Sequence, residues 1–324
     1  MVYAISGHSR QAQILNRTVI SPRAKLHRRR DRRACIRYAK PYQLCHTSLY
    51  FSSVNKGYIT HYLLYIKLSN QGFTMTIKVL IRIVLIAFSW FELSMITLLL
   101  YTLSYLPRKL TQPFYFPLFR YWCKSFVCAL GVDLRLHEKN HHPIPSQYIL
   151  IANHPSSFED VGIPATFPVH SLAKAEVADW WWAGRITVAA GTLYVQRESR
   201  ESRRDAGKQI IEALAEGKNV CIYPEGGCKG RRIFESFRYG AFDISLQTGV
   251  PILPVFLHYE AQDTFEWREP YTLIQTFWRI MSAQNNRANI YQYDAIDPKQ
   301  FHSKEDYYAY AHNLYLQWQQ RYLD

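Results

Sequence analysis

The sequence predicts an α/β fold, a mostly parallel central sheet flanked by helices, preceded by an N-terminal membrane-associated helical segment. Three observations support this prediction. After residue 131, short apolar runs typical of buried strands alternate with helical patterns, as in parallel strand–helix–strand units. Residues 79–106 are apolar over a length that can cross a bilayer. The chain has 324 residues and is 48% hydrophobic, enough for one large domain or two small ones.

Residues 1–74 differ from the rest of the chain in charge. The first 78 residues contain 14 of the 39 Lys and Arg residues and one acid, Asp31, so the remainder is close to neutral. The run from His27 to Arg33 could bind nucleic acid or anionic lipid, but it lacks hydrophobic periodicity. We expect residues 1–74 to form a basic, disordered tail. Alternatively, translation starts at Met75 and this stretch is not made.

Residues 75–130 are expected to form the membrane-associated helical segment. The apolar stretch 79–106 is interrupted by Glu92, and it either spans the bilayer or enters one leaflet as two helical pieces. Bases at both ends leave its orientation open. Residues 107–117 predict a proline-punctuated turn, and residues 118–130 predict an aromatic, basic helix for the membrane interface or the core.

Residues 131–324 are expected to form the α/β domain. The predicted strands cover residues 132–137, 148–152, 169–172, 193–195, 220–223 and 251–257. The predicted helices cover residues 177–190, 203–216 and 240–247. A capping box at Ser303 begins a C-terminal helix with one buried face, Tyr307, Tyr310, Ala311, Leu314 and Trp318.

Polar residues follow the strand at 148–152. Asn153 and His154 come where it ends, and the next residues, 155–157, can break the strand and cap a helix. Glu159 and Asp160 then lie in the first helical turn. One imidazole and two carboxylates are therefore held near the carboxyl end of a central strand, where open α/β sheets bind ligands. Histidine is the usual side chain for taking a proton near neutral pH, and a nearby acid can fix its tautomer.

Two other strand ends carry similar residues. Arg197 follows the strand at 193–195, and Glu225 with Gly226 follows the strand at 220–223. Parallel strands present their carboxyl ends on the same edge, so we expect these residues to converge with His154 and Glu159. Such a set suits transfer chemistry on an anionic substrate, because arginine binds phosphate bidentately and glycine lets the backbone approach closely.

Other common chemistries lack their motifs. The six cysteines form no CxxC pair and no zinc-finger spacing, so free thiols in a reduced compartment are expected and no metal site is predicted. No GxSxG, GxGxxG, Walker or HExxH motif is present, which argues against ordinary serine hydrolases, dinucleotide enzymes, ATPases and zinc proteases.

Four sequence blocks resemble those of the glycerolipid acyltransferases, the PlsC-type family of 1-acylglycerol-3-phosphate acyltransferase. Asn153–Glu159 resembles the NHx4D signature, and Gly191–Arg197 resembles the second block. Tyr223–Gly226 resembles the FPEG motif, and Val250–Val255 resembles VPIxPV. Further similar positions are Lys174–Glu176, Gly184 and Phe237–Gly240. The blocks occur in the family's order, and the resemblance covers residues 75–260.

The resemblance implies a mechanism and site residues. His154 would act as the general base on a glycerol hydroxyl, oriented by Glu159, and the alkoxide would attack an acyl thioester. Arg197 would hold the acceptor phosphate, and Glu225 and Gly226 would shape the same site. We extend the predicted substrate-binding set to Gly227 and Lys229. The co-substrate would be a thioester of coenzyme A or acyl carrier protein, with no other cofactor.

Two departures from the family pattern concern the site. Glu159 stands where the family has aspartate, and the adjacent Asp160 is a possible substitute that we include among the catalytic residues. Cys228 stands where the third block usually has arginine, and Lys229 or Arg231 could replace its charge, although lysine lacks the guanidinium fork. This second departure concerns the acceptor head group more than the reaction.

The resemblance therefore implies a membrane-bound O-acyltransferase that makes phosphatidic acid from 1-acylglycerol-3-phosphate. The alternatives are another lysolipid or amino-acid-lipid acceptor, a catalytically silent family member, and, more distantly, a basic nucleic-acid-binding membrane protein. Expected partners are the lipid bilayer, a lysophospholipid acceptor and the thioester donor, and no nucleic acid. The catalytic domain is expected on the cytoplasmic side of the membrane.

Overall fold

The computed structural model describes residues 75–324, and the expectations for the basic N-terminal tail lie outside the described residues. Within this range seven strands form one sheet in the order β1-β7-β6-β2-β5-β3-β4. The strands are β1 (Asp133–Glu138), β2 (Ile149–Ala152), β3 (Val169–Lys174), β4 (Leu193–Val195), β5 (Asn219–Ile222), β6 (Ile252–Tyr259) and β7 (Arg287–Gln292). All neighbouring pairs are parallel except β6–β7, which confirms the predicted mostly parallel sheet.

The central strand β2 is covered on both faces, as its continuous apolar sequence predicts. Ile149 and Ile151 point to one cluster of buried side chains, whereas Leu150 and Ala152 point to another on the opposite face. This alternation follows from the two-residue repeat of a strand. β5 and β6 flank β2 in parallel register, so the strand that precedes His154 lies in the middle of the sheet.

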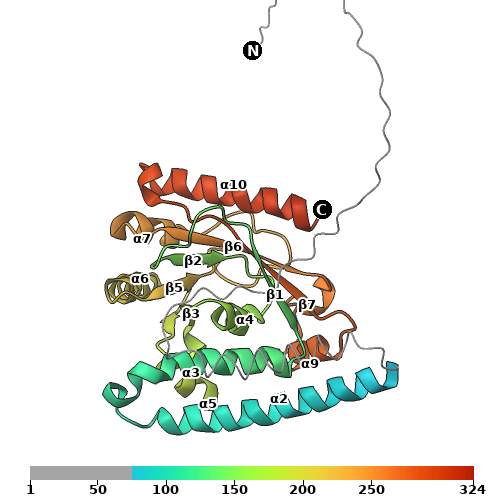
Figure 1. Cartoon of the computed structure of the whole chain (residues 1–324). Helices are drawn as coiled ribbons and strands as arrows, with labels where there is room; N and C mark the ends of the chain where they lie inside the picture. Colours follow the sequence, from blue (N-terminus) through green and yellow to red (C-terminus); the bar gives the residue numbers. More distant parts are fainter. Residues whose placement is uncertain (1–74) are drawn as a thin grey trace, which may run out of the picture. The chain divides into compact units, whose positions relative to one another are not determined.

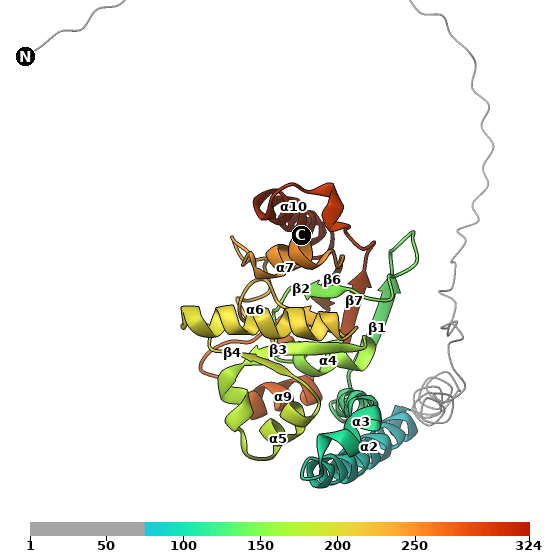
Figure 2. The ribbon, with the colours of Figure 1, turned by 90° about the vertical axis from the view of Figure 1, so that its left-hand side faces the viewer.

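Three helices cover the face of Ile149 and Ile151: α6 (Arg200–Ala215), α7 (Gly240–Thr248) and α10 (Lys304–Tyr322). Figures 1 and 2 show α7 and α10 together on this side. Ser303 caps α10 by accepting from the backbone N–H of Asp306. The prediction that Tyr310 lies on the buried face is wrong, because Tyr310 is exposed and Tyr315 is buried instead. The hydroxyl of Tyr315 is hydrogen-bonded to the backbone carbonyls of Ile151 and Val255.

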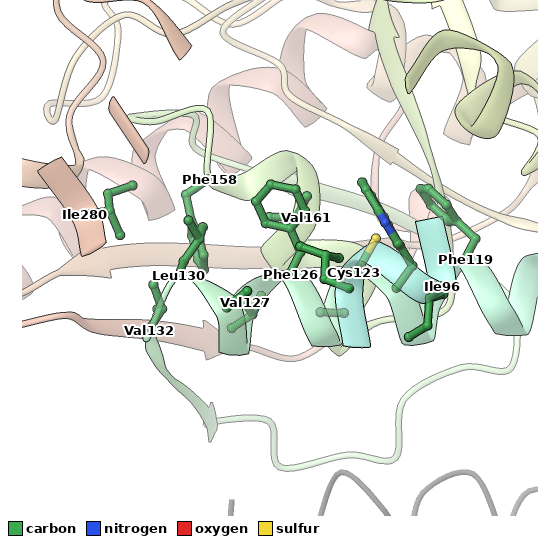
Figure 3. Packing of buried hydrophobic residues seen from close by; sticks show 14 of the residues in the cluster. Ile96, Phe119, Cys123, Phe126, Val127, Leu130, Val132, Phe158, Val161 and Ile280 are labelled. Atoms are coloured by element: carbon green, nitrogen blue, oxygen red, sulfur yellow. The ribbon is translucent and has the colours of Figure 1, made fainter. Parts of the chain in front are cut away.

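On the other face, α4 (Glu159–Thr166) lies between the sheet and a layer of further helices (Figure 1). That layer contains α2 (Met75–Leu103), α3 (Arg108–Ala129), α5 (Trp181–Ala189) and α9 (Leu273–Ser282). Figure 3 shows their shared apolar cluster, in which Phe126 of α3 lies near Val161 of α4. The remaining short helices are η1 (Ala175–Asp179), α8 (Gln262–Phe265) and η2 (Pro298–Gln300).

The helices α2 and α3 pack side by side (Figures 1 and 2); they exclude one alternative for the apolar segment and correct one prediction. The apolar segment is one continuous helix rather than two pieces. The predicted proline turn ends at Pro107, because α3 begins at Arg108 and continues through Pro113 and Pro117. Burial of aromatic side chains, including Tyr115 with its hydroxyl bonded to the carbonyl of Leu100, outweighs the backbone hydrogen bonds that the prolines remove.

The helix α2 has the length and composition of a membrane span. Within the described range, Val79–Leu103 is the one helical stretch that is long and apolar enough to cross a bilayer, by length and composition alone. Its single acid, Glu92, accepts a hydrogen bond from the hydroxyl of Tyr121 on α3. The carboxylate therefore faces the partner helix, which reduces the cost of placing it in an apolar segment.

Candidate active site

The predicted site residues lie at one edge of the sheet. β2, β3, β4, β5 and β6 run in the same direction, so their carboxyl ends share that edge. His154 follows β2 and Glu225 follows β5, and the backbone N–H of His154 donates to Glu225 Oε1 over 3.1 Å. Asn153 fastens the end of β2 to β6, because its side-chain amide exchanges two hydrogen bonds with the backbone of Leu257 (2.7 and 3.0 Å).

His154 is buried and held from three directions. Its Nδ1 lies 3.2 Å from Glu159 Oε2, and its ring stacks on Tyr223 with the centroids 4.1 Å apart. The backbone bond to Glu225 fixes the third direction. These contacts leave Nε2 as the ring nitrogen available for a proton-transfer partner.

Glu159 sits at the start of α4 and accepts several hydrogen bonds. The backbone N–H of Ser156 lies 3.1 Å from both carboxylate oxygens, and the hydroxyl of Tyr259, at the end of β6, donates to Oε1 over 2.5 Å. The prediction that residues 155–157 cap the helix with a side chain is wrong, because α4 begins after Phe158 without such a bond. The carboxylate instead accepts the loop's backbone donor, which directs it at His154.

The environment of the pair favours a neutral imidazole. Burial lowers the pKa of His154 to about 4, and the nearby charge of Asp160 opposes this shift. Burial raises the pKa of Glu159 to about 8, and the hydrogen bonds from Tyr259 and Ser156 only partly oppose this rise. When Glu159 is ionised, Nδ1 donates to the carboxylate and Nε2 accepts, which is the tautomer of a general base.

The two candidate acids occupy different positions. Glu159 is buried and contacts the imidazole, whereas the side chain of Asp160 is exposed on the first turn of α4. Asp160 acts on His154 only through its charge, which raises the pKa of the imidazole. Both stay among the predicted catalytic residues, and the geometry favours Glu159 as the orienting acid.

Arg197 comes two residues after β4 and is half-buried. Its guanidinium lies beside Gly227, where an added Cβ would be 2.9 Å from the Arg197 Nη1. Its positive charge contributes to lowering the pKa of His154, so it faces the same site. In the described part of the chain no ion pair joins it to Glu198 or Glu201, the surface partners that would leave it without a binding role.

The loop after β5 carries the other predicted binding residues. Glu225 is buried, burial raises its pKa to about 8, and its Oε2 has no hydrogen-bond partner among the described residues. Gly226 has a φ of 74°, which favours glycine. Lys229 is exposed, with its Nζ 5.1 Å from the ring centroid of Phe234. Glu225 contacts His154 directly, whereas Lys229 points at the ring of Phe234 instead.

Arg231, one proposed replacement for the missing arginine, already forms ion pairs with other side chains. Its guanidinium pairs with Glu266 at 2.9 Å and also with Asp263. Its backbone N–H donates to Glu266 as well, over 2.9 Å. The side chain therefore anchors the loop to α8 and the residues that follow it, and Lys229 remains the candidate for the missing charge.

Cys228 occupies the position next to the imidazole. Its Sγ lies 3.4 Å from His154 Nε2 and 3.4 Å from the backbone carbonyl of Ser156. Within residues 75–324 no group of three or more His, Cys, Asp or Glu residues could hold a metal ion. The contact is therefore one between a thiol and an imidazole.

Sequence reasoning missed the roles of Tyr223, Tyr259 and Cys228. Tyr259 is the last residue of β6, whereas the predicted strand ends at residue 257, so Tyr259 lay beyond the predicted strand end. Tyr223 opens the third block and Cys228 lies within it, yet a stacking contact and a thiol–imidazole contact depend on loop geometry that spacing does not give.

Comparisons with known proteins match the chain to acyltransferases. The family model described as Acyltransferase matches residues 133–258. The chain is 28% identical over 190 residues to lyso-ornithine lipid O-acyltransferase of Pseudomonas aeruginosa, covering 57% of this chain and 72% of that protein. It is 30% identical to lysophosphatidylcholine acyltransferase of Drosophila melanogaster, and the match covers 51% of this chain and 31% of that protein. It is 26% identical to 1-acyl-sn-glycerol-3-phosphate acyltransferase of Neisseria gonorrhoeae, and the match covers 49% of this chain and 64% of that protein.

A solved structure has the same fold. The 1-acyl-sn-glycerophosphate (LPA) acyltransferase PlsC of Thermotoga maritima superposes with a TM-score of 0.55 at 18% identity, covering 73% of this chain and 93% of that one. The second and third sequence relatives are matched over less than two thirds of their own length.

Proposed function

Because the chain belongs to the PlsC-type glycerolipid acyltransferase family, we propose that it transfers a fatty acyl group from an acyl thioester to a free hydroxyl of a lysophospholipid. The proposed acceptor is 1-acylglycerol-3-phosphate, and the product is phosphatidic acid. One observation carries the proposal. A buried, neutral His154, oriented at Nδ1 by Glu159, turns Nε2 toward the edge of the sheet where Arg197 lies.

His154 removes the proton from the acceptor hydroxyl through Nε2, and the resulting alkoxide attacks the thioester carbonyl. Glu159 keeps the proton of the neutral imidazole on Nδ1 and stabilises the imidazolium that forms during the transfer. The collapsing intermediate expels a thiolate, which takes the proton back from the imidazolium. The donor thioester is carried by coenzyme A or by acyl carrier protein.

Arg197 binds the phosphate of the acceptor. A guanidinium offers two parallel N–H donors to a phosphate, and no ion pair with the neighbouring acids occupies it in the described part of the chain. Gly227 supports this role, because any side chain there would push the guanidinium aside. Glu225, Gly226 and Lys229 complete the binding loop.

Membrane attachment is supported by the distribution of apolar surface. Of the 26 exposed large apolar side chains in residues 75–324, 22 lie on four segments. We call these segments the membrane face: residues 77–99, 105–114, 180–188 and 271–278. They lie on or next to helices that share one apolar cluster, and Figures 1 and 2 show α2, α3, α5 and α9 on the same side. Exposed apolar side chains in this number, gathered on one side, suit contact with a bilayer.

Arginines border this surface. Arg185 of α5 lies 3.8 Å from the ring centroid of Tyr105, and Arg279 of α9 lies 4.3 Å from that of Tyr271. Tryptophan, tyrosine and arginine are the residues found where a protein meets lipid headgroups. We place the catalytic domain on the cytoplasmic side, where thioester donors are available. Protease protection in sealed vesicles tests this side of the membrane.

The residue at position 228 favours a second acceptor class, the amino-acid lipids. Cys228 stands where the family usually has arginine, and the relative from Pseudomonas aeruginosa is named for a lyso-ornithine lipid. An amino-acid lipid would need less positive charge in its site than a phosphate ester. The two classes differ in how much they depend on Arg197.

An acyl-transfer assay tests the proposed function. Vesicles containing 1-acylglycerol-3-phosphate, a second lysophospholipid or a lyso-amino-acid lipid are each supplied with acyl-coenzyme A or acyl carrier protein thioester. We expect the highest kcat/KM for 1-acylglycerol-3-phosphate. Preference for the amino-acid lipid would select the alternative acceptor, and no transfer to any lysolipid would refute the function.

A further inference from the structure

A thiol, an imidazole and a carboxylate lie in sequence at the centre of the site. Cys228 Sγ is 3.4 Å from His154 Nε2, and His154 Nδ1 is 3.2 Å from Glu159 Oε2. Nucleophilic enzymes use this order of groups, in which the base contacts the nucleophile and a third group orients the base. The inference from it rests on the proposed function.

The thiol is held against the imidazole by the geometry of its loop. Gly226 and Gly230, on either side of it, have φ values of 74° and 99°, which favour glycine. Arg231, next in the chain, is tied to Glu266 through both its backbone and its guanidinium. The loop is thus anchored beyond Gly230. Its backbone conformation, rather than a flexible side chain, holds Cys228 next to His154.

This contact constrains the order of steps. Nδ1 is engaged by Glu159, so Nε2 is the nitrogen through which His154 can accept a proton, and the Cys228 thiol adjoins it. An acceptor hydroxyl must therefore either displace the thiol or react after it. A cysteine sulfur that loses its proton to an adjacent base as it attacks is a stronger nucleophile toward a thioester than a hydroxyl, which favours the second route.

We propose that Cys228 is a catalytic nucleophile that receives the acyl group from the thioester donor and passes it to the acceptor. In the first step the Cys228 sulfur forms a bond to the acyl carbon, and the donor's carbon–sulfur bond breaks. His154 takes the thiol proton and returns it to the departing thiolate. In the second step His154 takes the acceptor's hydroxyl proton, the new carbon–oxygen bond forms, and the proton returns to Cys228 as its carbon–sulfur bond breaks.

The chemistry balances without another reactant. One thioester replaces another in the first step, so the acyl group remains activated for ester formation in the second. Burial and the negative charges of Glu159 and Asp160 raise the pKa of Cys228, and the positive charge of Arg197 only partly opposes this shift. The resting pair is therefore a neutral thiol beside a neutral imidazole, and the proton moves to His154 as the sulfur attacks.

Intact-mass measurement tests the acyl-enzyme. The full-length protein is incubated with palmitoyl-coenzyme A without acceptor and quenched in acid. We expect one palmitoyl adduct per chain, mapped to Cys228 and equal in amount to the coenzyme A released, and its loss on addition of the lysophospholipid. Cys228→Ala should form no adduct, and its turnover should fall roughly 100-fold or more, the scale of losing one catalytic group.

Two further variants separate chemistry from folding. Cys128→Ala removes the other partly exposed cysteine of the described residues, on α3, and should form the adduct at the normal rate. Cys228→Ser keeps the size of the side chain but is a poorer nucleophile, so it should keep the unfolding temperature while turnover falls. Normal turnover in Cys228→Ala or Cys228→Ser, with no adduct in the unmodified protein, would overturn the proposal and leave the proposed function intact. If the unmodified protein forms neither adduct nor acylated lysolipid, both fail.

Discussion

The His154 ring has a neighbour on one face and at each nitrogen: it stacks on Tyr223, its Nδ1 lies beside Glu159 and its Nε2 lies beside Cys228. Such a ring cannot turn without breaking several contacts. The carboxylate at Nδ1 does the orienting, and glutamate is long enough to do so from the first turn of α4 while it also accepts from the backbone of Ser156. The extra methylene relative to aspartate is thus accommodated by the loop.

The two neighbouring acids should therefore contribute unequally. Glu159→Gln should lower kcat roughly 100-fold or more, because the amide cannot hold the tautomer or support the imidazolium. Asp160→Asn should cost less, because this exposed carboxylate acts on His154 only through its charge. Steady-state kinetics of both variants, with thermal unfolding as the check on folding, decides the assignment. A larger loss in Asp160→Asn would reverse it.

The pH dependence of kcat/KM follows from the buried pair. Since burial lowers the pKa of His154 to about 4, the imidazole is neutral at pH 7. With Glu159 ionised, activity should fall only as pH drops well below the ordinary histidine pKa of about 6.5. Tyr259→Phe removes a hydrogen bond that lowers the pKa of Glu159, so the pair should hold its proton to higher pH and the acid limb should move upward. An acid limb at or above pH 6.5 in the unmodified protein would mean that Glu159 binds the proton first.

Arg197 should affect the acceptor rather than the donor. Arg197→Ala should raise the KM for 1-acylglycerol-3-phosphate roughly 10- to 150-fold, the effect of losing a charged hydrogen bond of about 1.5–3 kcal/mol. The KM for the thioester should change little, and Arg197→Lys should restore only part of the loss. Arg204→Ala, at an exposed position on α6, is the matched control. An unchanged acceptor KM in Arg197→Ala would exclude phosphate binding.

At the scale of elements, the strand ends were predictable and the contacts between elements were not. Apolar runs locate β2, β4, β5 and β6 within two residues, and the parallel arrangement brings their carboxyl ends together. β7 was missed, because its sequence Arg-Ala-Asn-Ile-Tyr-Gln is half polar and its buried Asn289 bonds to His137 of β1. The helix α3 was shortened in the prediction, because local rules for proline do not include the packing of Tyr115 and Phe119.

The helices of the membrane face permit a direct test. Trp181 of α5 and Trp278 of α9 are 81% and 68% exposed, although tryptophan is usually buried or at an interface. Trp181→Ala and Trp278→Ala should each weaken binding to lipid vesicles about tenfold, since burying a large apolar side chain is worth about 1.5–3 kcal/mol.

The control is Tyr310→Ala, which removes a 46% exposed aromatic side chain on α10, across the sheet from the membrane face. Vesicle co-sedimentation measures all three variants. Equal losses in the three would show that these tryptophans contribute no specific lipid contact.

At the scale of the whole molecule, the described residues contain two distinct regions, an apolar layer of helices and a polar edge of the sheet. The helices α2, α3, α5 and α9 present apolar side chains, whereas the shared edge of β2, β4, β5 and β6 presents the imidazole, the carboxylates and Arg197. An amphipathic acceptor needs both, because its acyl chain belongs in the bilayer and its hydroxyl must reach His154. The excess positive charge of the chain lies in residues 1–78 and is not required by this division.

The acyl-transfer rate of His154→Ala tests the central claim most directly. The variant and the unmodified protein are compared in vesicles with saturating 1-acylglycerol-3-phosphate and a labelled acyl thioester, and phosphatidic acid is quantified over time. Loss of the general base should lower kcat roughly 10²–10⁴-fold, while the unfolding temperature and vesicle binding stay close to those of the unmodified protein. Phosphatidic acid formation at a near-normal rate by His154→Ala would contradict the account.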